Sequence, residues 1–426
     1  MDERRVAQPS FAIANEQLFR WQHALNTPRR TPDSRFLASL AAIAFIGPLA
    51  IHLFLPVLPE VQKAFYMSAA LTGAMFSVTL MMVACSTLVY GSLSDRYGRR
   101  PVLLVGLILF VLGSALSSIA TSPTGLIIGR VLQAIGAGAP ASLSRAIASD
   151  AYGSEQLVKV LAYLTMAYTL GPMFAPSVSG QLIDTFGWRS TFWFALAMGV
   201  IISYGAWRYL YETRAAVKST FSVTTLLAGY LTLLKQPRFC GYVFQTGFST
   251  ATFMATITAA SFLMQDYLNR PASEYGLYFM MLPLGLFLGN FVASRLSGRV
   301  AIDLMVLAGS VLMACSVAAQ AAIMLWGTLT PLVIFIPCAV LTFAQGIAMP
   351  NGQTGAMRLA RNAAGTAAGL GVFCQSFLGA LGAQTYALLA NGTPNPMVIT
   401  ITAFALLTLI AGAVPYALRP ADHESR

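Results

Sequence analysis

Residues 91–101 read GSLSDRYGRRP and stand between two long apolar runs, at residues 71–92 and 102–121. Each run has about the 20 apolar residues that an α-helix needs to cross the hydrocarbon core of a membrane. A tight loop between two such helices needs glycine for the turn, and an aspartate among arginines supplies an ionic contact at the membrane surface. A loop that only carried positive charge would need the arginines but not the Gly, Asp, Gly spacing. The stretch therefore predicts a helical hairpin with a charged latch.

The rest of the chain repeats this apolar pattern. Of its 426 residues, 57% are hydrophobic and only 10% are charged, against roughly a quarter charged in a soluble domain. A transmembrane barrel would show alternating segments of about ten residues instead of long runs. The sequence thus predicts an all-α polytopic membrane protein with twelve transmembrane helices, at residues 36–58, 71–92, 102–121, 125–147, 158–184, 190–210, 238–264, 275–296, 303–326, 331–350, 364–390 and 397–418.

The basic residues indicate the orientation of these spans. Of the 26 Lys and Arg residues, only Lys63, Arg189 and Arg270 fall on loops that follow odd-numbered spans, and Arg130 lies within the fourth span. The others lie on the opposite side, together with both ends of the chain. Because cytoplasmic loops carry an excess of Lys and Arg, we expect both termini to be cytoplasmic.

A short internal repeat divides the spans into two pseudo-symmetric sets of six. Gly73-Ala-Met-Phe76 opens the second span and Gly276-Leu-Tyr-Phe279 opens the eighth, and Gly98-Arg99 and Gly298-Arg299 end the loops that follow. Repeated halves are typical of transporter folds. The expected organisation is an N-terminal tail, a first half, a cytoplasmic linker, a second half and a C-terminal tail, at residues 1–35, 36–210, 211–237, 238–418 and 419–426.

The polar N-terminal tail has two possible interpretations. The apolar residues Phe11, Ala14, Leu18, Trp21 and Leu25 follow a faint helical stripe, which an interfacial helix would use beside the bilayer. A disordered basic leader fits the composition equally well. The tail and the length of the first apolar run argue against a cleaved signal peptide.

Several classes of protein are excluded by the residues present. The net charge of +11 is scattered between the spans, so it favours no nucleic-acid partner. The five cysteines form no C-x-x-C pair, and His52 is the only histidine inside a span, so we expect no metal and no cofactor. The motifs of serine hydrolases, zinc proteases and P-loop enzymes are missing, and the sequence does not predict an enzyme.

Three motifs in the first half resemble those of a known family. GSLSDRYGRRP resembles the signature loop of the major facilitator superfamily, which implies a cytoplasmic gate formed by Gly91, Asp95, Arg96, Gly98, Arg99, Arg100 and Asp150. The fourth span contains the helix-packing residues Gln133, Gly136 and Gly138 after Arg130 and looks like the superfamily's second motif. The fifth span is similar to the antiporter motif of drug/proton antiporters, with Gly171, Pro172, Pro176 and Gly180.

The second half narrows the resemblance. Met349-Pro350-Asn351-Gly352 and Ala364-Gly365-Thr366-Ala367 are similar to the ends of the tenth and eleventh spans in the bicyclomycin and chloramphenicol resistance branch. The resemblance implies proton-coupled export of small, largely apolar organic compounds by alternating access. It also implies a multi-pass protein of a bacterial inner membrane that works as a monomer, with lipid, protons and a small organic substrate as its partners.

Two departures from that branch leave a second function open. An acidic residue is usual four positions before the first proline of Leu55-Pro56-Val57-Leu58-Pro59, and this chain has His52 there. In the fifth span, Ser179-Gly180 stands where that branch has a pair of glycines. Both departures favour proton-linked uptake of a small nutrient, such as a vitamin or an aromatic metabolite, as the alternative. A non-transporting receptor is disfavoured because no sizeable soluble domain is attached.

Ionisable residues inside a span are costly and therefore indicate function. Here they are His52 and Arg130, which are the candidates for proton coupling and for contacting substrate. With an ordinary pKa near 6.5, His52 could couple to protons, contact substrate or serve only structure. Arg130 is expected to face a central cavity, with snorkelling outward as the alternative. Weaker cavity candidates, each also a plausible interhelical hydrogen bond, are Tyr168, Gln245, Asn290, Gln345, Asn351 and Gln375.

Overall fold

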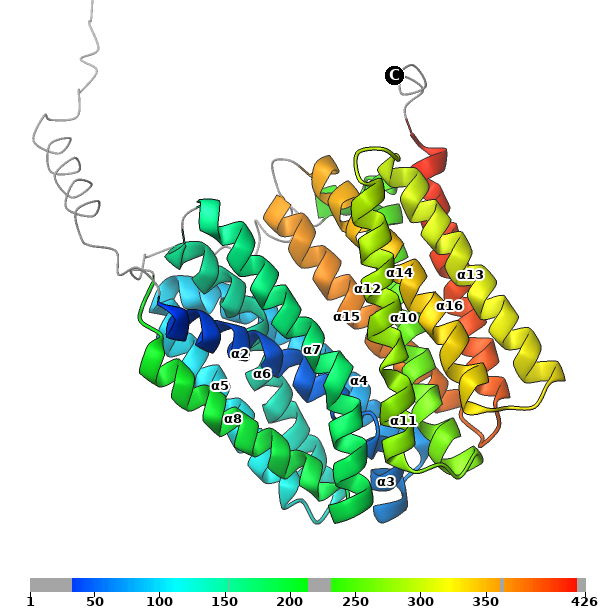
Figure 1. Cartoon of the computed structure of the whole chain (residues 1–426), viewed down its shortest axis with the longest axis horizontal. Coiled ribbons are helices and arrows are strands. Elements are labelled where there is room, and N and C mark those ends of the chain that lie inside the picture. The colour runs from blue at the N-terminus through cyan, green and yellow to red at the C-terminus, as the bar shows by residue number, and fades with distance from the viewer. Residues whose placement is uncertain (1–32, 153, 214–230, 361–363, 420–426) are drawn as a thin grey trace, which may run out of the picture.

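The computed structural model describes residues 33–152, 154–213, 231–360 and 364–419, and it is a bundle of long helices (Figure 1). The predicted tail helix, the centre of the linker and most of the C-terminal tail lie outside the described residues. The helices are α2 Ser34–His52, α3 Val57–Ala64, α4 Ala69–Tyr97, α5 Arg99–Ser118, α6 Pro123–Ala151, α7 Ser154–Phe186, α8 Arg189–Tyr209, α10 Pro237–Phe262, α11 Ala272–Phe279, α12 Met281–Leu296, α13 Ile302–Trp326, α14 Pro331–Leu359, α15 Ala364–Leu389 and α16 Asn395–Ala417.

Each of the twelve predicted spans corresponds to a long helix, with α11 and α12 together forming the eighth. In the described part of the chain, eleven are long and apolar enough to cross a membrane. The exception, α7, is also long, but it carries Pro172, Pro176 and several hydroxyl residues. These residues lower the mean hydropathy of the helix. The fold is that of an all-α polytopic membrane protein.

The boundaries of two spans are corrected at prolines. The first span was predicted to run to residue 58, but α2 ends at His52 and a separate short helix, α3, begins at Val57. Pro56 and Pro59 cannot donate the backbone hydrogen bonds that would continue the helix. The predicted eighth span is interrupted at Met280, between α11 and α12. Pro283 explains the interruption, because a proline ring in a continuous helix would clash with the carbonyl group four residues earlier, which is that of Phe279.

The predicted loop at residues 91–101 is mostly helix. α4 continues to Tyr97 and α5 begins at Arg99, so Gly98 alone separates them. Gly98 has φ +97, a value that glycine adopts without strain. The tenth span is likewise longer than predicted, since α14 runs past Pro350 to Leu359. Hydropathy detects the part of a helix inside the bilayer, and these helices extend beyond it.

The helices pack in two groups, α2–α8 and α10–α16 (Figure 1). One hydrophobic core lies wholly within the first group and another within the second. A third, larger core joins both groups and includes Phe54, Val61, Phe262, Tyr275 and Tyr386. We propose that these groups are the two six-helix halves with the boundaries that the sequence predicts, and we call them the N-terminal half and the C-terminal half.

Both ends of the bundle, Ser34 and Ala417, lie on one side, because twelve crossings separate them. We call this the terminus side, and we call the opposite side, which holds α3 and the turn between α7 and α8, the distal side. The two halves contact each other chiefly through α4 with α15 and through α7 with α11. Residues from the distal portions of these helices contribute to the core that joins the two halves.

Candidate functional site

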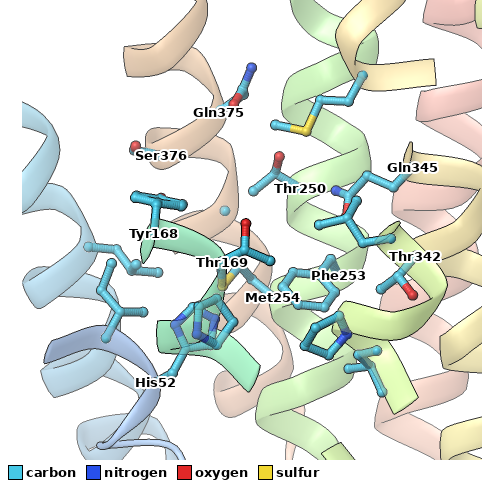
Figure 2. Close-up of a pocket in the computed structure, with 18 of the residues that line it drawn as sticks. His52, Tyr168, Thr169, Thr250, Phe253, Met254, Thr342, Gln345, Gln375 and Ser376 are labelled. Atoms are coloured by element: carbon cyan, nitrogen blue, oxygen red, sulfur yellow. The ribbon is translucent and has the colours of Figure 1, made fainter. Parts of the chain in front are cut away.

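A cavity of about 260 Å³ lies between the two halves (Figure 2). His52 on α2, Leu80 on α4 and Tyr168, Thr169 and Pro172 on α7 line it from the N-terminal half. From the C-terminal half, side chains of α10, α11, α12, α14 and α15 line it, and these are Thr250, Phe253, Met254, Phe279, Leu282, Pro283, Leu286, Thr342, Gln345, Met349, Gln375 and Ser376. We call it the central cavity.

The lining of the central cavity is apolar with a few neutral polar groups. None of the described residues that line it is Asp, Glu, Lys or Arg. Its polar groups are hydroxyls, the amides of Gln345 and Gln375, and the imidazole of His52. The Nε2 atom of Gln375 is buried without a hydrogen-bond partner among the described residues, so it is available as a donor to a ligand. Such a lining suits a neutral, mostly apolar molecule.

His52 presents one nitrogen to the cavity. Its Nδ1 lies 3.0 Å from the carbonyl oxygen of Pro48, one turn earlier in α2. A carbonyl oxygen only accepts hydrogen bonds, so Nδ1 donates, and in the neutral ring Nε2 is then the acceptor. The ring also meets the edge of Phe279 across the interface, with 5.9 Å between ring centroids. His52 therefore lies at the contact between the two halves, with a free acceptor.

Arg130 lies outside the central cavity, contrary to the cavity-facing position expected from the sequence. It is 2% exposed and packs inside the N-terminal half, with its guanidinium 4.1 Å from the ring centroid of Phe54. It donates to the carbonyl oxygen of Ala50 at 3.3 Å and to the side chain of Gln133, which in turn donates to Ser114 at 2.8 Å. The arginine thus joins α6 to α2 and α5, and it neither lines the cavity nor snorkels outward.

Some of the other polar candidates line the central cavity and others lie outside it. Tyr168, Gln345 and Gln375 line the central cavity, whereas Gln245 and Asn351 do not. Gln245 is buried and donates to Ser310 at 3.2 Å, and Asn351 donates to the carbonyl oxygen of Ile347 at 2.8 Å. Both therefore make hydrogen bonds inside the C-terminal half.

Several cavity residues on α10 and α14 were not predicted from the sequence. A signal was present, because Thr250, Phe253 and Met254 follow the i, i+3, i+4 spacing of one helical face, and Thr342, Gln345 and Met349 follow the i, i+3, i+7 spacing.

The distal side of the cavity is closed by direct contact between α7 and α11. A Cβ atom added to Gly276 would lie 2.5 Å from the carbonyl oxygen of Pro176 and 2.5 Å from Cα of Ser177. A Cβ atom added to Gly180 would lie 2.6 Å from the carbonyl carbon of Ala272. Glycine at both positions lets the two backbones touch. We call this contact the distal seal.

Hydrogen bonds between the halves surround the distal seal. Ser177 donates to the carbonyl oxygen of Gly276 at 2.6 Å, and Ser261 donates to that of Leu55 at 2.6 Å. The carboxylate of Asp184, near the end of α7, accepts the backbone N–H groups of Ala272 at 3.2 Å and Ser273 at 2.9 Å. In the described residues, every hydrogen bond recorded between the halves lies toward the distal side.

An ion pair also joins the halves on this side. Nζ of Lys63 on α3 lies 3.0 Å from the carboxylate of Asp266 and 3.7 Å from that of Glu60. Burial alone would lower the pKa of Lys63, but its hydrogen bond and attraction to Asp266, with those to Glu60, outweigh burial and raise the pKa above its ordinary value. Lys63 therefore stays charged at neutral pH. Lys63 is more than half exposed, so we expect the pair to contribute little.

The predicted gate residues form a charged network within the N-terminal half, on the terminus side. The Arg99 guanidinium lies 2.9 Å from Asp95 and 2.9 Å from Asp150, and it donates to Ser94 at 2.6 Å. Glu212, which the sequence analysis missed, accepts the backbone N–H groups of Arg99 at 2.9 Å and Arg100 at 3.1 Å. It thus caps the start of α5 from beyond the end of α8.

Two other gate residues lie at the edge of this network. The guanidinium of Arg96 lies 5.2 Å from the ring centroid of Tyr97. Gly91 lies within α4, where an added Cβ would meet no atom within 4 Å.

The packing glycines contact neighbouring helices of their own half. A Cβ atom on Gly136 would overlap the backbone of Phe110 on α5, and one on Gly138 would overlap Ser86 on α4. Gly171 packs on Pro48 of α2, where a Cβ atom would lie 2.5 Å from the proline Cβ. These glycines let α6 and α7 lie against the helices that carry the gate and His52.

Two groups of membrane-length helices, with a cavity between them that is closed on one side, are the architecture of a polytopic membrane transporter. The family model described as Major Facilitator Superfamily matches residues 40–383, and the chain belongs to that family.

Relatives with known names resemble the chain over most of its length. It is 24% identical to a bicyclomycin resistance protein homolog of Haemophilus influenzae, covering 88% of this chain and 94% of the relative. It is 25% identical to multidrug resistance protein D of Escherichia coli, covering 90% of this chain and 96% of that protein.

Solved structures share the fold. A bacterial homolog of the human lysosomal transporter Spinster, in an inward-facing and unoccupied conformation, matches with a TM-score of 0.74 at 16% identity, covering 92% of this chain and 97% of that one. A D-xylose-proton symporter matches with a TM-score of 0.71 at 13% identity, covering 91% and 98%.

Proposed function

We propose that this protein is a secondary active transporter that exports small, largely apolar organic compounds in exchange for protons. The observation that carries the proposal is the uncharged, apolar and aromatic lining of a cavity between two halves that meet on one side of it. The names of the bicyclomycin and multidrug resistance relatives support this substrate class. Export from a bacterial inner membrane by a monomer is consistent with all of these features.

The distribution of Lys and Arg supports a cytoplasmic terminus side. With that orientation, the distal seal closes the cavity to the outside, and the structure represents an inward-facing state. Alternating access then requires the contact between α7 and α11 to separate while the terminus side closes. The network of Asp95, Arg99 and Asp150 is in place to support closure there, because it holds the ends of α4, α5 and α6 together.

His52 provides an atom at which a proton and a substrate can replace each other. Its Nε2 can accept either a proton or a hydrogen bond from a substrate, but not both at once. A proton that enters from outside would occupy Nε2, and its release to the cytoplasm would restore the acceptor for the next substrate. Because protonation removes the acceptor, the apparent affinity for substrates that donate to Nε2 should fall as the pH in the cavity falls. Competition between proton and substrate at one atom gives antiport when the protein changes conformation only with that atom occupied.

Inside-out vesicles with an acidic lumen test the proposal. A panel of neutral organic compounds is added while lumenal pH is followed, with vesicles that lack the protein as the first control. Proton release upon addition of a compound is the expected result, and His52→Ala should abolish it. Ser294→Ala, on α12 and outside the central cavity, is the control and should retain it. Proton release that is equal in His52→Ala would remove the role of His52 but not the antiport.

Uptake of a small nutrient is the second candidate, and the observation that favours it is the absence of a carboxylate among the described cavity residues. If no compound of the panel releases protons, radiolabelled vitamins and aromatic metabolites are tested in right-side-out vesicles. Proton-driven accumulation there, lost when the gradient is dissipated, would replace export by uptake.

A further inference from the structure

A second cavity lies on the terminus side of the C-terminal half, away from the central cavity. Its volume is about 500 Å³. It is formed where α10 and α13 begin and where α14 and α16 end, and its lining residues are Arg238, Tyr242, Ala301, Ile302, Asp303, Gly355, Arg358, Leu359 and Arg419. We call it the arginine pocket. Three arginines and one aspartate give its lining an excess of positive charge.

The one carboxylate among the described residues of the arginine pocket is already bound to α10. Asp303 is buried, and its Oδ2 lies 2.5 Å from Nη2 of Arg238 while its Oδ1 accepts from the hydroxyl of Tyr242. The Nε of Arg238 remains buried without a hydrogen-bond partner among the described residues. Arg358 is exposed at the end of α14, and no ion pair is recorded for it within the described ranges. Asp303 therefore does not neutralise the pocket.

The corresponding place in the N-terminal half carries different charges from those of the arginine pocket. There Arg99 begins the third helix of the half, Asp150 ends the fourth, and Glu212 follows the sixth. In the C-terminal half, the third helix begins beside Asp303, the fourth ends beside Arg358, and Arg419 follows the sixth. Two carboxylates of the N-terminal half are thus replaced by two arginines.

The two halves also differ in what the backbone N–H groups at the start of the third helix bind. Glu212 caps the first turn of α5 with its carboxylate. The first turn of α13 has no side-chain cap, since Ala301 stands at the capping position. Uncapped N–H groups at a helix start favour an anion, and arginines around them add charge-assisted hydrogen bonds. The arginine pocket has the donors of such a site, and its described lining residues have no counterpart of the Asp150 and Glu212 carboxylates of the other half.

We propose that the arginine pocket binds a phosphate group, which takes the place of the two missing carboxylates. The tetrahedral anion would accept hydrogen bonds from Arg358 and from the free edge of Arg238, close to the start of α13. The planar fork of arginine matches phosphate oxygens in pairs. The group can come from a free phosphate compound or from the headgroup of an anionic phospholipid, because both present the same chemistry. This site is separate from the transport cavity, and its existence does not depend on the direction of transport.

Thermal unfolding of the purified full-length protein tests the site with two probes. Inorganic phosphate is titrated at constant ionic strength against chloride in a neutral detergent, and nanodiscs of phosphatidylglycerol are compared with nanodiscs of phosphatidylcholine. Arg358→Gln is the test variant, because its exposed side chain can be replaced without disturbing the core. Arg299→Gln is the matched control, since Arg299 is exposed nearby in the same half but does not line the pocket.

The expected result is an increase in Tm with one of the two probes in the wild type and in Arg299→Gln. Arg358→Gln should bind that probe about tenfold or more weakly, as expected for loss of charge-assisted hydrogen bonds. Stabilisation by inorganic phosphate identifies a free phosphate compound, and stabilisation by phosphatidylglycerol alone identifies a lipid headgroup. No stabilisation by either probe, or equal loss in Arg299→Gln, would overturn the proposal.

A second variant guards against a purely structural effect of the first. Arg358→Glu restores at the end of α14 the kind of carboxylate that Asp150 provides at the end of α6. The unliganded variant should be at least as stable as the wild type, and phosphate or phosphatidylglycerol should no longer raise its Tm. A Tm that still rises by the wild-type amount would contradict the site.

Discussion

Gly276→Ala should shift the protein from the conformation described here toward one that opens on the distal side. The added methyl group would lie 2.5 Å from the carbonyl oxygen of Pro176, 2.5 Å from Cα of Ser177 and 2.7 Å from the carbonyl carbon of Pro176. All three are backbone atoms of α7, so no side-chain rotation can make room. Because ordinary contact begins near 3.4 Å, α7 and α11 must separate by roughly 1 Å in the sealed state.

The magnitude follows from the cost of overpacking. One methyl group inserted into a packed contact costs about 1–3 kcal/mol. Only the state in which α7 and α11 touch carries this cost, so the ratio of distally open to sealed molecules should rise about 5-fold to 150-fold. Membrane insertion and the packing within each half should be unaffected, since Gly276 contacts the opposite half.

Labelling of a cysteine in the central cavity measures this ratio. Thr250→Cys is introduced into a variant that lacks the five native cysteines, and a membrane-impermeant maleimide is added to each side of the membrane in turn. Gly276→Ala should accelerate labelling from the distal side. Gly371→Ala is the control, because a Cβ atom there meets nothing within 4 Å. Equal rates in the two variants would refute the assignment of α7 and α11 as the seal.

Three other substitutions distinguish strong from weak contacts. Lys63→Met removes a half-exposed ion pair between the halves, so labelling from the distal side should rise less than about fivefold. Glu212→Gln weakens the cap of α5 and should lower the free energy of unfolding by about 1 kcal/mol, seen as a lower Tm in detergent. Arg130→Ala should lower the Tm by removing a desolvated cation–π contact with Phe54 of about 2 kcal/mol, while substrate affinity, measured by equilibrium binding, stays within twofold because the arginine lies outside the cavity. A large loss of affinity with unchanged Tm would instead place Arg130 at the substrate.

The helices of this protein were largely predictable because the membrane fixes their length. The errors arise where the bilayer is not the limiting factor. Asp95 and Asp150 lie in the last turns of α4 and α6, where polar residues end an apolar run without ending the helix. Pro56 ends α2 early, whereas Pro350 lies inside α14. Hydropathy alone does not tell these two prolines apart, because the outcome depends on the packing of neighbouring helices.

The cavity was only partly predictable for a related reason. Polarity inside a span indicated His52, Tyr168 and Gln375, which line the cavity, and it also indicated Arg130 and Gln245, which do not. All are costly in lipid and must point inward. A polar side chain that points away from lipid can face either the other half or the core of its own half. The rotation of each helix about its axis determines which of the two it faces. That rotation depends on contacts such as Gly136 against Phe110, which are distant in sequence.

The composition of the distal seal fits the requirement that a transporter must open it repeatedly. A contact built from buried ion pairs would hold one state too firmly, because separating such charges leaves each of them unpaired. Among the described residues, the halves meet on this side through close backbone packing at Gly180 and Gly276, a few hydrogen bonds and one half-exposed ion pair. Each hydrogen bond contributes about 1 kcal/mol net, since water replaces it on opening. The energy difference between sealed and open states is then small enough for a bound substrate or proton to reverse it.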